Sequence, residues 1–176
     1  EHKKELIKDW YEIFFDTGKE KGRKFEAYGD ESLTFIYNNE RNKLIAELAR
    51  KNKRVLLLYD KVRHGKEVMK LLPEAILVDG ESSIKERDAA QKYIADKENA
   101  IVLASSIWFK GVDIVSIGTI IMVNSSVSTI RIIQRLGRGV RKDKSIGKIN
   151  VKIIDFDEGW NPLSKKQSSK RIRIYR

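Results

Sequence analysis

Five short runs of mostly branched aliphatic residues recur along the sequence, and each run is almost continuously apolar. A strand with one face in water alternates apolar and polar residues, whereas these runs leave no polar face. They are therefore typical of strands in a parallel sheet that is covered on both faces, and this requirement limits the fold more than any other feature. The runs are Val55–Tyr59, Ala75–Val78, Ala100–Ala104, Thr119–Val123 and Ile149–Asp155.

Segments with helical patterns lie between the apolar runs. Gly65–Leu72 ends before Pro73, which cannot continue a helix. Ser83 and Glu86 have the spacing of a capping box, which opens the next helix. The alternation of strands and helices predicts a parallel, right-handed α/β sheet with helices on both faces. Two further helices are expected at Asn39–Lys51 and Val127–Arg141.

The chain of 176 residues has the length of one ordinary domain. Residues 39–160 contain the strands and helices of that domain, and residues 161–176 form a basic C-terminal tail. Residues 1–38 are expected to be an N-terminal extension or linker, with a helical part whose apolar stripe packs on the domain. The stripe consists of Leu6, Ile7, Trp10, Ile13 and Phe14.

The chain carries a formal net charge of +11 and has a pI near 9.7. A charge of this size favours a polyanionic partner, of which nucleic acid is the usual one. No apolar run approaches the length of a membrane span, and the amino terminus has no signal peptide. With no cysteine and two histidines, no metal site is expected. We expect a soluble cytoplasmic protein without membrane contact, in the host cytoplasm if phage-encoded and nuclear if eukaryotic.

The run from Gln134 to Arg141 is the most informative for function. Gln134, Arg138 and Arg141 are spaced so that an amide and two guanidinium groups fall on one helix face. Gly137 and Gly139 keep this face small, although glycine disfavours a helix. Two permanently charged, forked donors suit a polyphosphate. The alternatives are a solvated basic helix end and a non-specific contact to nucleic acid.

Polar residues follow three of the predicted strands, where ligands of open α/β sheets bind. Gly80 and Gly111 permit close approach of the backbone, and amides beside Ser105 and Ser106 could hold phosphate oxygens. Asp113 could accept a hydrogen bond from a ribose hydroxyl or serve only as a turn or cap residue. The three polar segments are residues 60–64, 79–83 and 105–113.

Three further side chains in or near these segments have two interpretations each. Arg87 lies one turn into the capped helix, as an ordinary surface arginine or as a contact to a nucleic-acid backbone. Trp108 and Phe109 could stack on bases or anchor a buried loop.

In order and spacing, these segments resemble the motifs of the C-terminal RecA-like domain of superfamily 2 helicases, across nearly the whole chain. The segment from Val55 to Asp60 resembles the motif IV strand. Asp79-Gly80-Glu81 followed by Glu86-Arg87 resembles motif IVa, and Ser105 to Ile114 resembles motif V. Gln134 to Arg141 matches the motif VI pattern Q-x-x-G-R-x-x-R.

Within the superfamily, four segments resemble the branch that contains phage UvsW and the XPB-like DNA helicases. Three residues depart from the usual patterns. Asp79 stands where histidine is frequent, Ile84 where some relatives have glutamine, and Ser105 where threonine is usual. The four segments are residues 38–45, the Asp60 and His64-Gly65 pair, Ile154–Asp157, and the tail with Ser168 or Ser169, Arg171 and Tyr175.

The resemblance implies an ATP-dependent motor that works on DNA, with ATP and Mg²⁺ as cofactors. The sequence has no G-x-x-x-x-G-K-[ST] and no D-E-x-H or D-E-A-D run, so the phosphate loop and magnesium ligands must come from another domain. The resemblance identifies that partner as an N-terminal RecA-like domain of the same polypeptide. Gln134, Arg138 and Arg141 are then catalytic, and together with Gly111 and Asp113 they bind ATP. The DNA-binding residues are Gly80, Arg87, Ser105, Ser106, Lys165, Lys166 and Arg171.

Two other function classes fit the same sequence. One is a stand-alone nucleic-acid-binding module derived from half a helicase, and the other is the motor part of a restriction or nuclease complex. No P-D…(D/E)-x-K cluster is present. The basic tail could add affinity for phosphates or be merely solvated.

Overall fold

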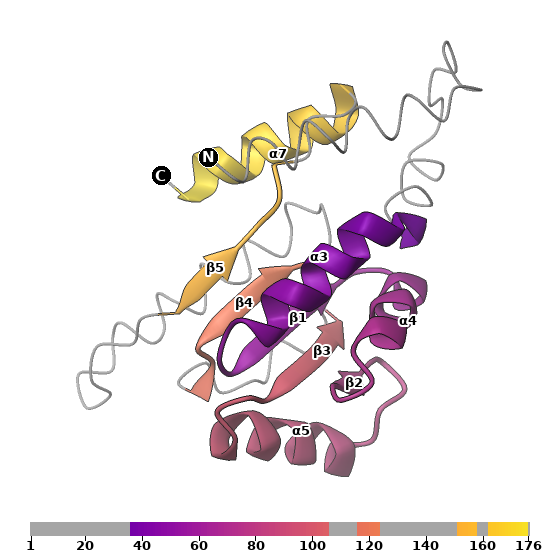
Figure 1. The fold of residues 1–176 in the computed structure, drawn as a ribbon, viewed down its shortest axis with the longest axis vertical. Helices are drawn as coiled ribbons and strands as arrows, with labels where there is room; N and C mark the ends of the chain where they lie inside the picture. Colours follow the sequence, from indigo (N-terminus) through magenta and orange to yellow (C-terminus); the bar gives the residue numbers. More distant parts are fainter. Residues whose placement is uncertain (1–35, 106–115, 124–150, 158–161, 176) are drawn as a thin grey trace.

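The computed structural model describes residues 36–105, 116–123, 151–157 and 162–175. Five parallel strands form one sheet in the order β2-β3-β1-β4-β5 (Figure 1). Parallel strands need crossover connections, and helices at Val62–Leu71 and Ile84–Asp96 lie in the connections from β1 to β2 and from β2 to β3. The strands are β1 (Val55–Tyr59), β2 (Ile76–Val78), β3 (Ile101–Ser105), β4 (Thr119–Met122) and β5 (Lys152–Ile154).

The central strand β1 is completely enclosed. Its five residues have no exposed surface, and it pairs with β3 on one side and β4 on the other. Residues 55–59 alternate between the two faces of the sheet, so the strand needs apolar residues at every position. The edge strand β5 differs, because Lys152 and Ile153 are exposed and only Ile154 is buried.

Helices cover both faces of the sheet. The helices α3 (Asn39–Arg50) and α4 (Val62–Leu71) pack on one face through Ile45, Ala49 and Val68. On the other face, α5 (Ile84–Asp96) buries Ala90 and Ile94 against β1, β2, β3 and β4. The result is a three-layer arrangement in which the helices occupy the two outer layers (Figure 1).

Local signals in the sequence account for where α3 and α5 begin. Asn38 caps α3, because its Oδ1 accepts a hydrogen bond of 2.9 Å from the backbone N–H of Arg41. Ser83 and Glu86 form the expected capping box, in which each side chain accepts from the backbone N–H of the other residue. These bonds satisfy donors that the first helical turn leaves unpaired.

A fourth helix, α7 (Pro162–Tyr175), lies beyond the carboxyl ends of the strands (Figure 1). Residues 161–176 were expected to be a basic tail, and no helix was predicted there. The helix has no acidic residue and little apolar character, so its periodicity is not visible as an apolar stripe.

The parallel sheet with helices on both faces is confirmed. Several boundaries differ from the prediction. The largest differences are that α4 begins at Val62 instead of Gly65 and that Val151 and Asp155 lie outside β5, whereas the bounds of α3, β2, β3 and β4 differ by one residue. The amino-terminal stripe and the helix expected at Val127–Arg141 lie outside the described residues.

Gly118 is required by close packing at the start of β4. A Cβ atom added there would lie 2.6 Å from the backbone oxygen of Lys53, which cannot move aside as the end of a flexible side chain could. We expect Gly118→Ala to lower the free energy of unfolding by about 1–3 kcal/mol, as overpacking does. Urea denaturation measures the change. Gly80→Ala is the matched control, because a Cβ there meets no atom within 4 Å and stability should change by less than about 0.5 kcal/mol.

Candidate functional site

Because all five strands are parallel, their carboxyl ends meet at one edge of the sheet. The polar segments that follow the strands therefore gather at this carboxyl edge, together with the first turns of the helices. The described part of the edge includes Asp60, the turn at residues 79–83, Ser105 and residues 155–157. In doubly wound folds, ligands bind at this edge.

The turn after β2 is held by the Asp79 carboxylate. Its Oδ1 accepts hydrogen bonds from the backbone N–H groups of Glu81 at 2.9 Å and Ser82 at 3.0 Å. The Ser82 hydroxyl in turn accepts from the backbone N–H of Asp79 at 3.0 Å. This use of Asp79 explains why a carboxylate suits a position where relatives often have histidine, because the side chain is engaged with its own turn.

Gly80 is the open point of that turn. Its carbonyl accepts a 3.2 Å hydrogen bond from Nη2 of Arg87, which joins the turn to the first part of α5. Nothing lies within 4 Å of the position where a Gly80 side chain would begin. The backbone is therefore accessible there, and a ligand could approach it closely.

Two polar atoms at this edge are buried without a hydrogen-bond partner among the described residues: Oγ of Ser105 and Nε of Arg87. Leaving a buried polar group unpaired costs about 1–3 kcal/mol. Both residues were predicted to contact phosphates. Unpaired donors at this edge are suited to that role, because a phosphate oxygen would accept from them.

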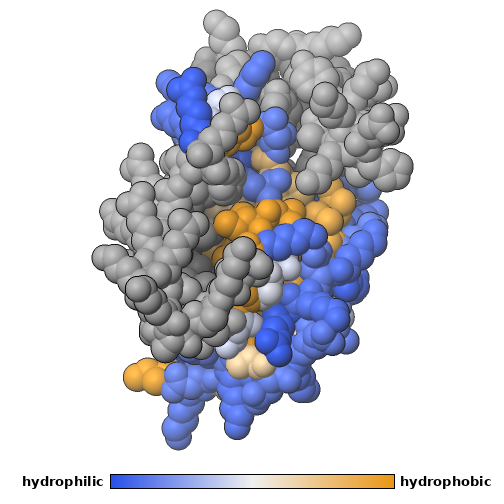
Figure 2. Space-filling view, turned by 90° about the vertical axis from the view of Figure 1, so that its left-hand side faces the viewer, coloured by the Kyte–Doolittle hydropathy of each residue, from blue (hydrophilic) through white to orange (hydrophobic). Residues whose placement is uncertain are grey.

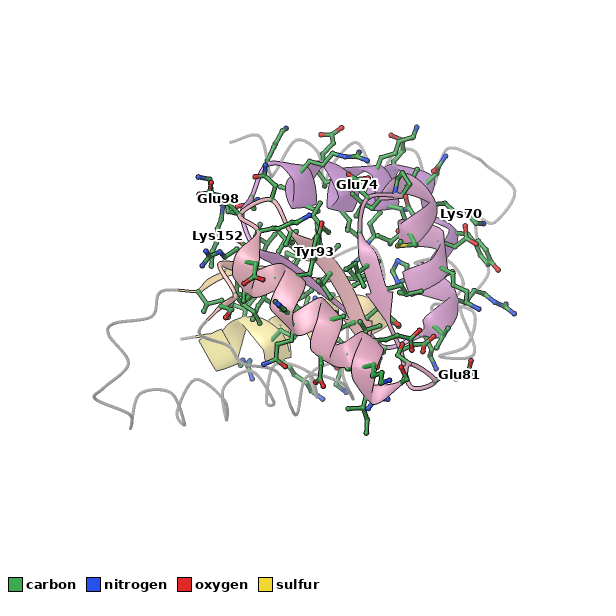
Figure 3. The ribbon with its side chains drawn as sticks, turned by 90° about the horizontal axis from the view of Figure 1, so that it is seen from below. Lys70, Glu74, Glu81, Tyr93, Glu98 and Lys152 are labelled. Atoms are coloured by element: carbon green, nitrogen blue, oxygen red, sulfur yellow. The ribbon has the colours of Figure 1, made fainter. Side chains whose placement is uncertain are left out.

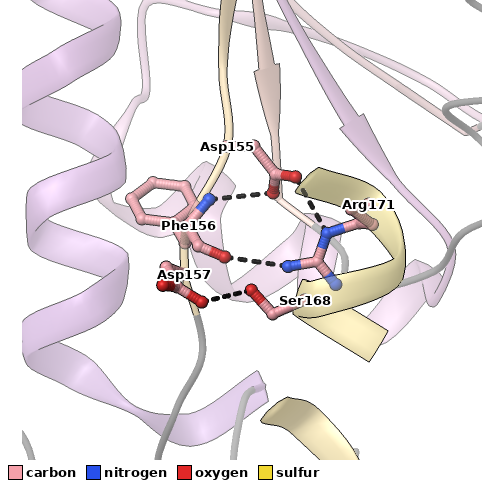
Figure 4. A network of polar contacts seen from close by, with 5 residues as sticks. All are labelled: Asp155, Phe156, Asp157, Ser168 and Arg171. Carbon is pink, nitrogen blue, oxygen red and sulfur yellow. Dashed lines mark hydrogen bonds and ion pairs between the residues drawn. The ribbon is translucent and has the colours of Figure 1, made fainter. Parts of the chain in front are cut away.

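A buried ion pair joins α7 to the end of β5 (Figure 4). Nε of Arg171 lies 2.8 Å from Oδ2 of Asp155, and Nη2 of Arg171 donates to the carbonyl of Phe156 at 2.8 Å. Ser168, one helical turn earlier, donates its hydroxyl proton to Asp157. The Arg171 side chain is 1% exposed, so losing Asp155 would leave a buried charge uncompensated at a cost of about 3–5 kcal/mol.

A second buried polar contact links α3 to α4. Nδ2 of Asn42 donates to the carbonyl of Ile36 at 2.9 Å, so its Oδ1 faces Nε2 of His64 at 3.0 Å as an acceptor. This geometry makes Nε2 the protonated nitrogen of a neutral imidazole. Burial, and to a smaller extent the nearby positive charge of Arg41, lower the pKa of His64 to about 3.

Arg41 connects the two contacts. Its guanidinium carbon lies 4.9 Å from the centre of the Phe156 ring, and its side chain is 1% exposed. Arginine over an aromatic ring gains about 2 kcal/mol or more when the pair is desolvated. The four segments that suggested the UvsW and XPB-like branch thus contribute residues to one cluster, in which Asp155 and Phe156 are half-buried, Asp157 is exposed and the other members are buried. Its members are Arg41, Asn42, His64, Asp155, Phe156, Asp157, Ser168 and Arg171.

The structure separates the predicted site residues into three groups. Gly80, Arg87 and Ser105 meet at the carboxyl edge, and Lys165 and Lys166 are exposed on α7. Arg171 was also predicted to bind DNA, but its guanidinium is buried against Asp155 and Phe156, so we withdraw that assignment. The remaining predicted residues lie outside the described part of the chain. They are Ser106, Gly111, Asp113, Gln134, Arg138 and Arg141.

The sequence analysis assigned no role to Arg41, Asn42 or Phe156. Each lies in a segment that carried the branch resemblance, and this was the only available signal. Within residues 36–105, 116–123, 151–157 and 162–175, no three His, Cys, Asp or Glu side chains group as metal ligands would. No helix in the same ranges is long and apolar enough to cross a bilayer.

Residues 38–143 match the family described as helicase conserved C-terminal domain. The match covers more than half of the chain, and the chain therefore belongs to this family. The family match confirms the expected helicase C-terminal domain, and the parallel sheet with helices on both faces confirms its RecA-like fold. No curated protein matches the sequence.

Solved structures of three helicase-type proteins have a similar fold. T4 UvsW has a TM-score of 0.64 and 22% identity, over 86% of this chain and 35% of its own. E. coli DEAD-box protein SrmB, solved bound to the regulator of ribonuclease activity A, has a TM-score of 0.54 and 20% sequence identity. The match covers 73% of this chain and 77% of the SrmB chain. The C-terminal part of the Fun30 ATPase domain has a TM-score of 0.55 and 14% sequence identity. The match covers 95% of this chain and 53% of the Fun30 chain. The chain spans about a third of the length of T4 UvsW, which lies in the branch that the sequence predicted.

The neutral, buried His64 makes stability depend on pH. The unfolded chain binds a proton at this histidine below pH 6.5, whereas the folded chain does so only near pH 3, so stability is lost as pH falls between these values. Between pH 7.5 and 5.5, we expect the free energy of unfolding to fall by about 1 kcal/mol. Urea titrations at both pH values measure the free energy of unfolding.

His64→Gln is the control, because it removes the titrating group and keeps a polar side chain near Asn42. The variant should be less stable at pH 7.5, yet its stability should change less between the two pH values. An equal pH dependence in both proteins would show that His64 does not titrate as its burial indicates.

Proposed function

We propose that the chain is the second motor domain of an ATP-dependent superfamily 2 DNA helicase or translocase. The family match over residues 38–143 carries the proposal, since this range includes every segment that resembles motifs IV, IVa, V and VI. The net charge of +11 supports a nucleic-acid substrate. A motor acting on DNA would work in the cytoplasm, or in the nucleus of a eukaryote.

In this proposal, ATP binds between this domain and an N-terminal RecA-like domain that holds the phosphates and Mg²⁺. Arg141 and Arg138 extend their guanidinium groups to the γ-phosphate and stabilise the negative charge that develops during transfer. From the same helix face, Gln134 makes a neutral contact to the nucleotide. Gly111 lets the backbone approach, and Asp113 accepts from the ribose.

The carboxyl edge supplies the surface that tracks one DNA strand. The carbonyl of Gly80 is linked to Arg87, whose Nε is unpaired among the described residues, as is the Ser105 hydroxyl. Together with Ser106, these groups would contact phosphates and not bases, so binding is independent of base sequence. The proposal keeps residues 39–160 as the motor domain, with residues 1–38 as an extension and residues 161–176 as a basic segment.

The 176-residue chain alone should hydrolyse ATP at a negligible rate, because it lacks the phosphate loop and the magnesium ligands. Release of phosphate, measured with and without DNA, tests this expectation. DNA-stimulated turnover by the purified chain would contradict the two-domain arrangement.

In the complete protein, Arg141→Ala should lower kcat by about 10³-fold or more, as loss of an arginine finger does. Arg138→Ala should be nearly as damaging, and Gln134→Ala milder because it removes a neutral contact. The affinity for ATP should change less than kcat, because the guanidinium groups act mainly on the transition state. Steady-state ATPase assays with saturating DNA measure both quantities.

Two further variants separate a specific role from a general effect of charge. Arg141→Lys should remain strongly impaired, because an ammonium cannot reproduce the forked geometry of guanidinium. Lys142→Ala removes the neighbouring cation outside the motif and should leave kcat within about threefold of the original. Unaltered turnover in Arg141→Ala would refute the assignment.

A further inference from the structure

The helix α7 has two chemically different sides. Ser168 and Arg171 are buried and attach the helix to Asp157 and Asp155, and Gln167 is half-buried beside them. The other described residues of the helix, at positions 165, 166, 169, 170, 172 and 173, are exposed. At about 100° per residue, the buried and exposed groups occupy separate arcs of the helix.

The exposed arc is strongly basic. Lys165, Lys166, Lys170 and Arg173 lie within about 140° of the helix circumference, and we call them the α7 basic face. Among the atoms that Figure 2 colours by hydropathy, those near the top, where α7 lies, are mostly hydrophilic. No residue from Pro162 to Tyr175 is acidic.

Some lysines of the other helices and loops are neutralised, whereas others, such as Lys61, Lys66, Lys85 and Lys92, form no ion pair with a described residue. Each of four exposed lysines pairs with a glutamate of the described chain, as Lys70, labelled in Figure 3, does with Glu67 at 2.7 Å. The α7 basic face forms no ion pair with any described residue. The four paired lysines are Lys43, Lys51, Lys53 and Lys70.

This absence of neutralisation has an energetic consequence. Lys166 and Lys170 are four residues apart on one helix, a spacing at which like charges repel. Lys165 and Lys166 also lie near the amino-terminal end of the helix, where the helix dipole disfavours cations. A polyanion placed against this face would relieve both effects.

We propose that α7 is a docked nucleic-acid-binding helix, held in place by the Arg171–Asp155 pair so that its basic face contacts consecutive phosphates. The inference rests on the proposed function for its choice of polyanion. It is supported by position, since Asp155 directly follows β5 at the carboxyl edge that also contains Gly80 and Ser105. The length also fits, because Lys165 to Arg173 spans about 12 Å along the helix, which matches about three to four phosphates of one strand.

The inference assigns different roles to basic residues that are adjacent in the sequence. Arg171 acts inside the protein and positions the helix, whereas Lys170 and Arg173 on either side of it face the nucleic acid. Charge alone does not distinguish these residues. A flexible basic tail would use all of them equally.

The first test compares two variants of the complete protein that each lose four positive charges. One replaces the α7 basic face with glutamine (K165Q, K166Q, K170Q, R173Q), and the other replaces the paired lysines (K43Q, K51Q, K53Q, K70Q). At about 0.1 M salt, the first should bind oligo-dT and a mixed-sequence duplex about 10- to 100-fold more weakly, with the slope of log affinity against log salt reduced by up to about four. For the second variant, the affinity for both DNA probes should fall by less than threefold.

The second test determines whether the attachment of α7 to Asp155 and Asp157 affects the affinity for DNA. Asp155→Asn keeps every cation of α7 and adds one unit of net positive charge, so a charge-only tail would bind as tightly or more tightly. A docked helix should instead bind several-fold more weakly. If Asp155→Asn fails to fold, Ser168→Ala serves instead, because it removes the contact to Asp157 without changing any charge. Circular dichroism and urea denaturation establish that each variant is folded.

Four results would overturn the inference: equal losses in the two quadruple variants, unchanged binding in the first of them, unchanged or tighter binding by Asp155→Asn, or poly-glutamate binding as strong and as α7-dependent as DNA binding. If ATP turnover still depends on Arg141 in such a case, the proposed function stands while the role of α7 falls. A wild-type protein with no affinity for either DNA probe would overturn both.

Discussion

Burial of the sheet on both faces is the constraint on which the rest of the structure depends. The central strand β1 has no exposed residue and lies between β3 and β4, so every residue from 55 to 59 must be accommodated in the core. This requirement brings α3 and α4 to one face and α5 to the other. Because the strands are parallel, the same requirement collects the polar segments after the strands at one edge. The site is therefore a geometric consequence of how the core is buried.

At that edge, the chain has charged and polar side chains in its interior as well as on its surface. Arg41, His64 and Arg171 are buried, and each is matched to a specific neighbour: a Phe156 ring, an Asn42 carbonyl oxygen and an Asp155 carboxylate. Buried polar groups of this kind add little net stability, but they are costly when only one member is present. They therefore specify how α3, α4, β5 and α7 meet. The orphaned Ser105 hydroxyl and Arg87 Nε have no such match among the described residues, which is why they are the better candidates for external contacts.

Much of the fold was predictable because its signals are local. The strand β1 was predicted at its observed bounds, and the start of α5 followed from the Ser83 and Glu86 spacing. Gly80 and Ser105 were expected at the carboxyl ends of parallel strands, where the structure places them, and their contact with DNA stays a prediction. The helix α7 was missed, since a helix attached through serine and arginine has no apolar stripe to reveal it. Arg171 was predicted to face DNA because the residues around it in the sequence are mostly basic, and nothing local indicates that its side chain is buried.

The sequence by itself determined the class of sheet, the order of its elements and the family, because apolar runs, capping residues and motif spacing are written in consecutive residues. Only the tertiary structure decided which basic residues are internal and which face outward. That distinction depends on Asp155 and Asp157, which lie 11 to 16 residues before their partners on α7 and face them only after β5 has joined the sheet. Likewise, only folding brings Asn42 against His64, 22 residues away. The sign of a charge can be read from a sequence, whereas its burial depends on contacts between segments that are distant along the chain.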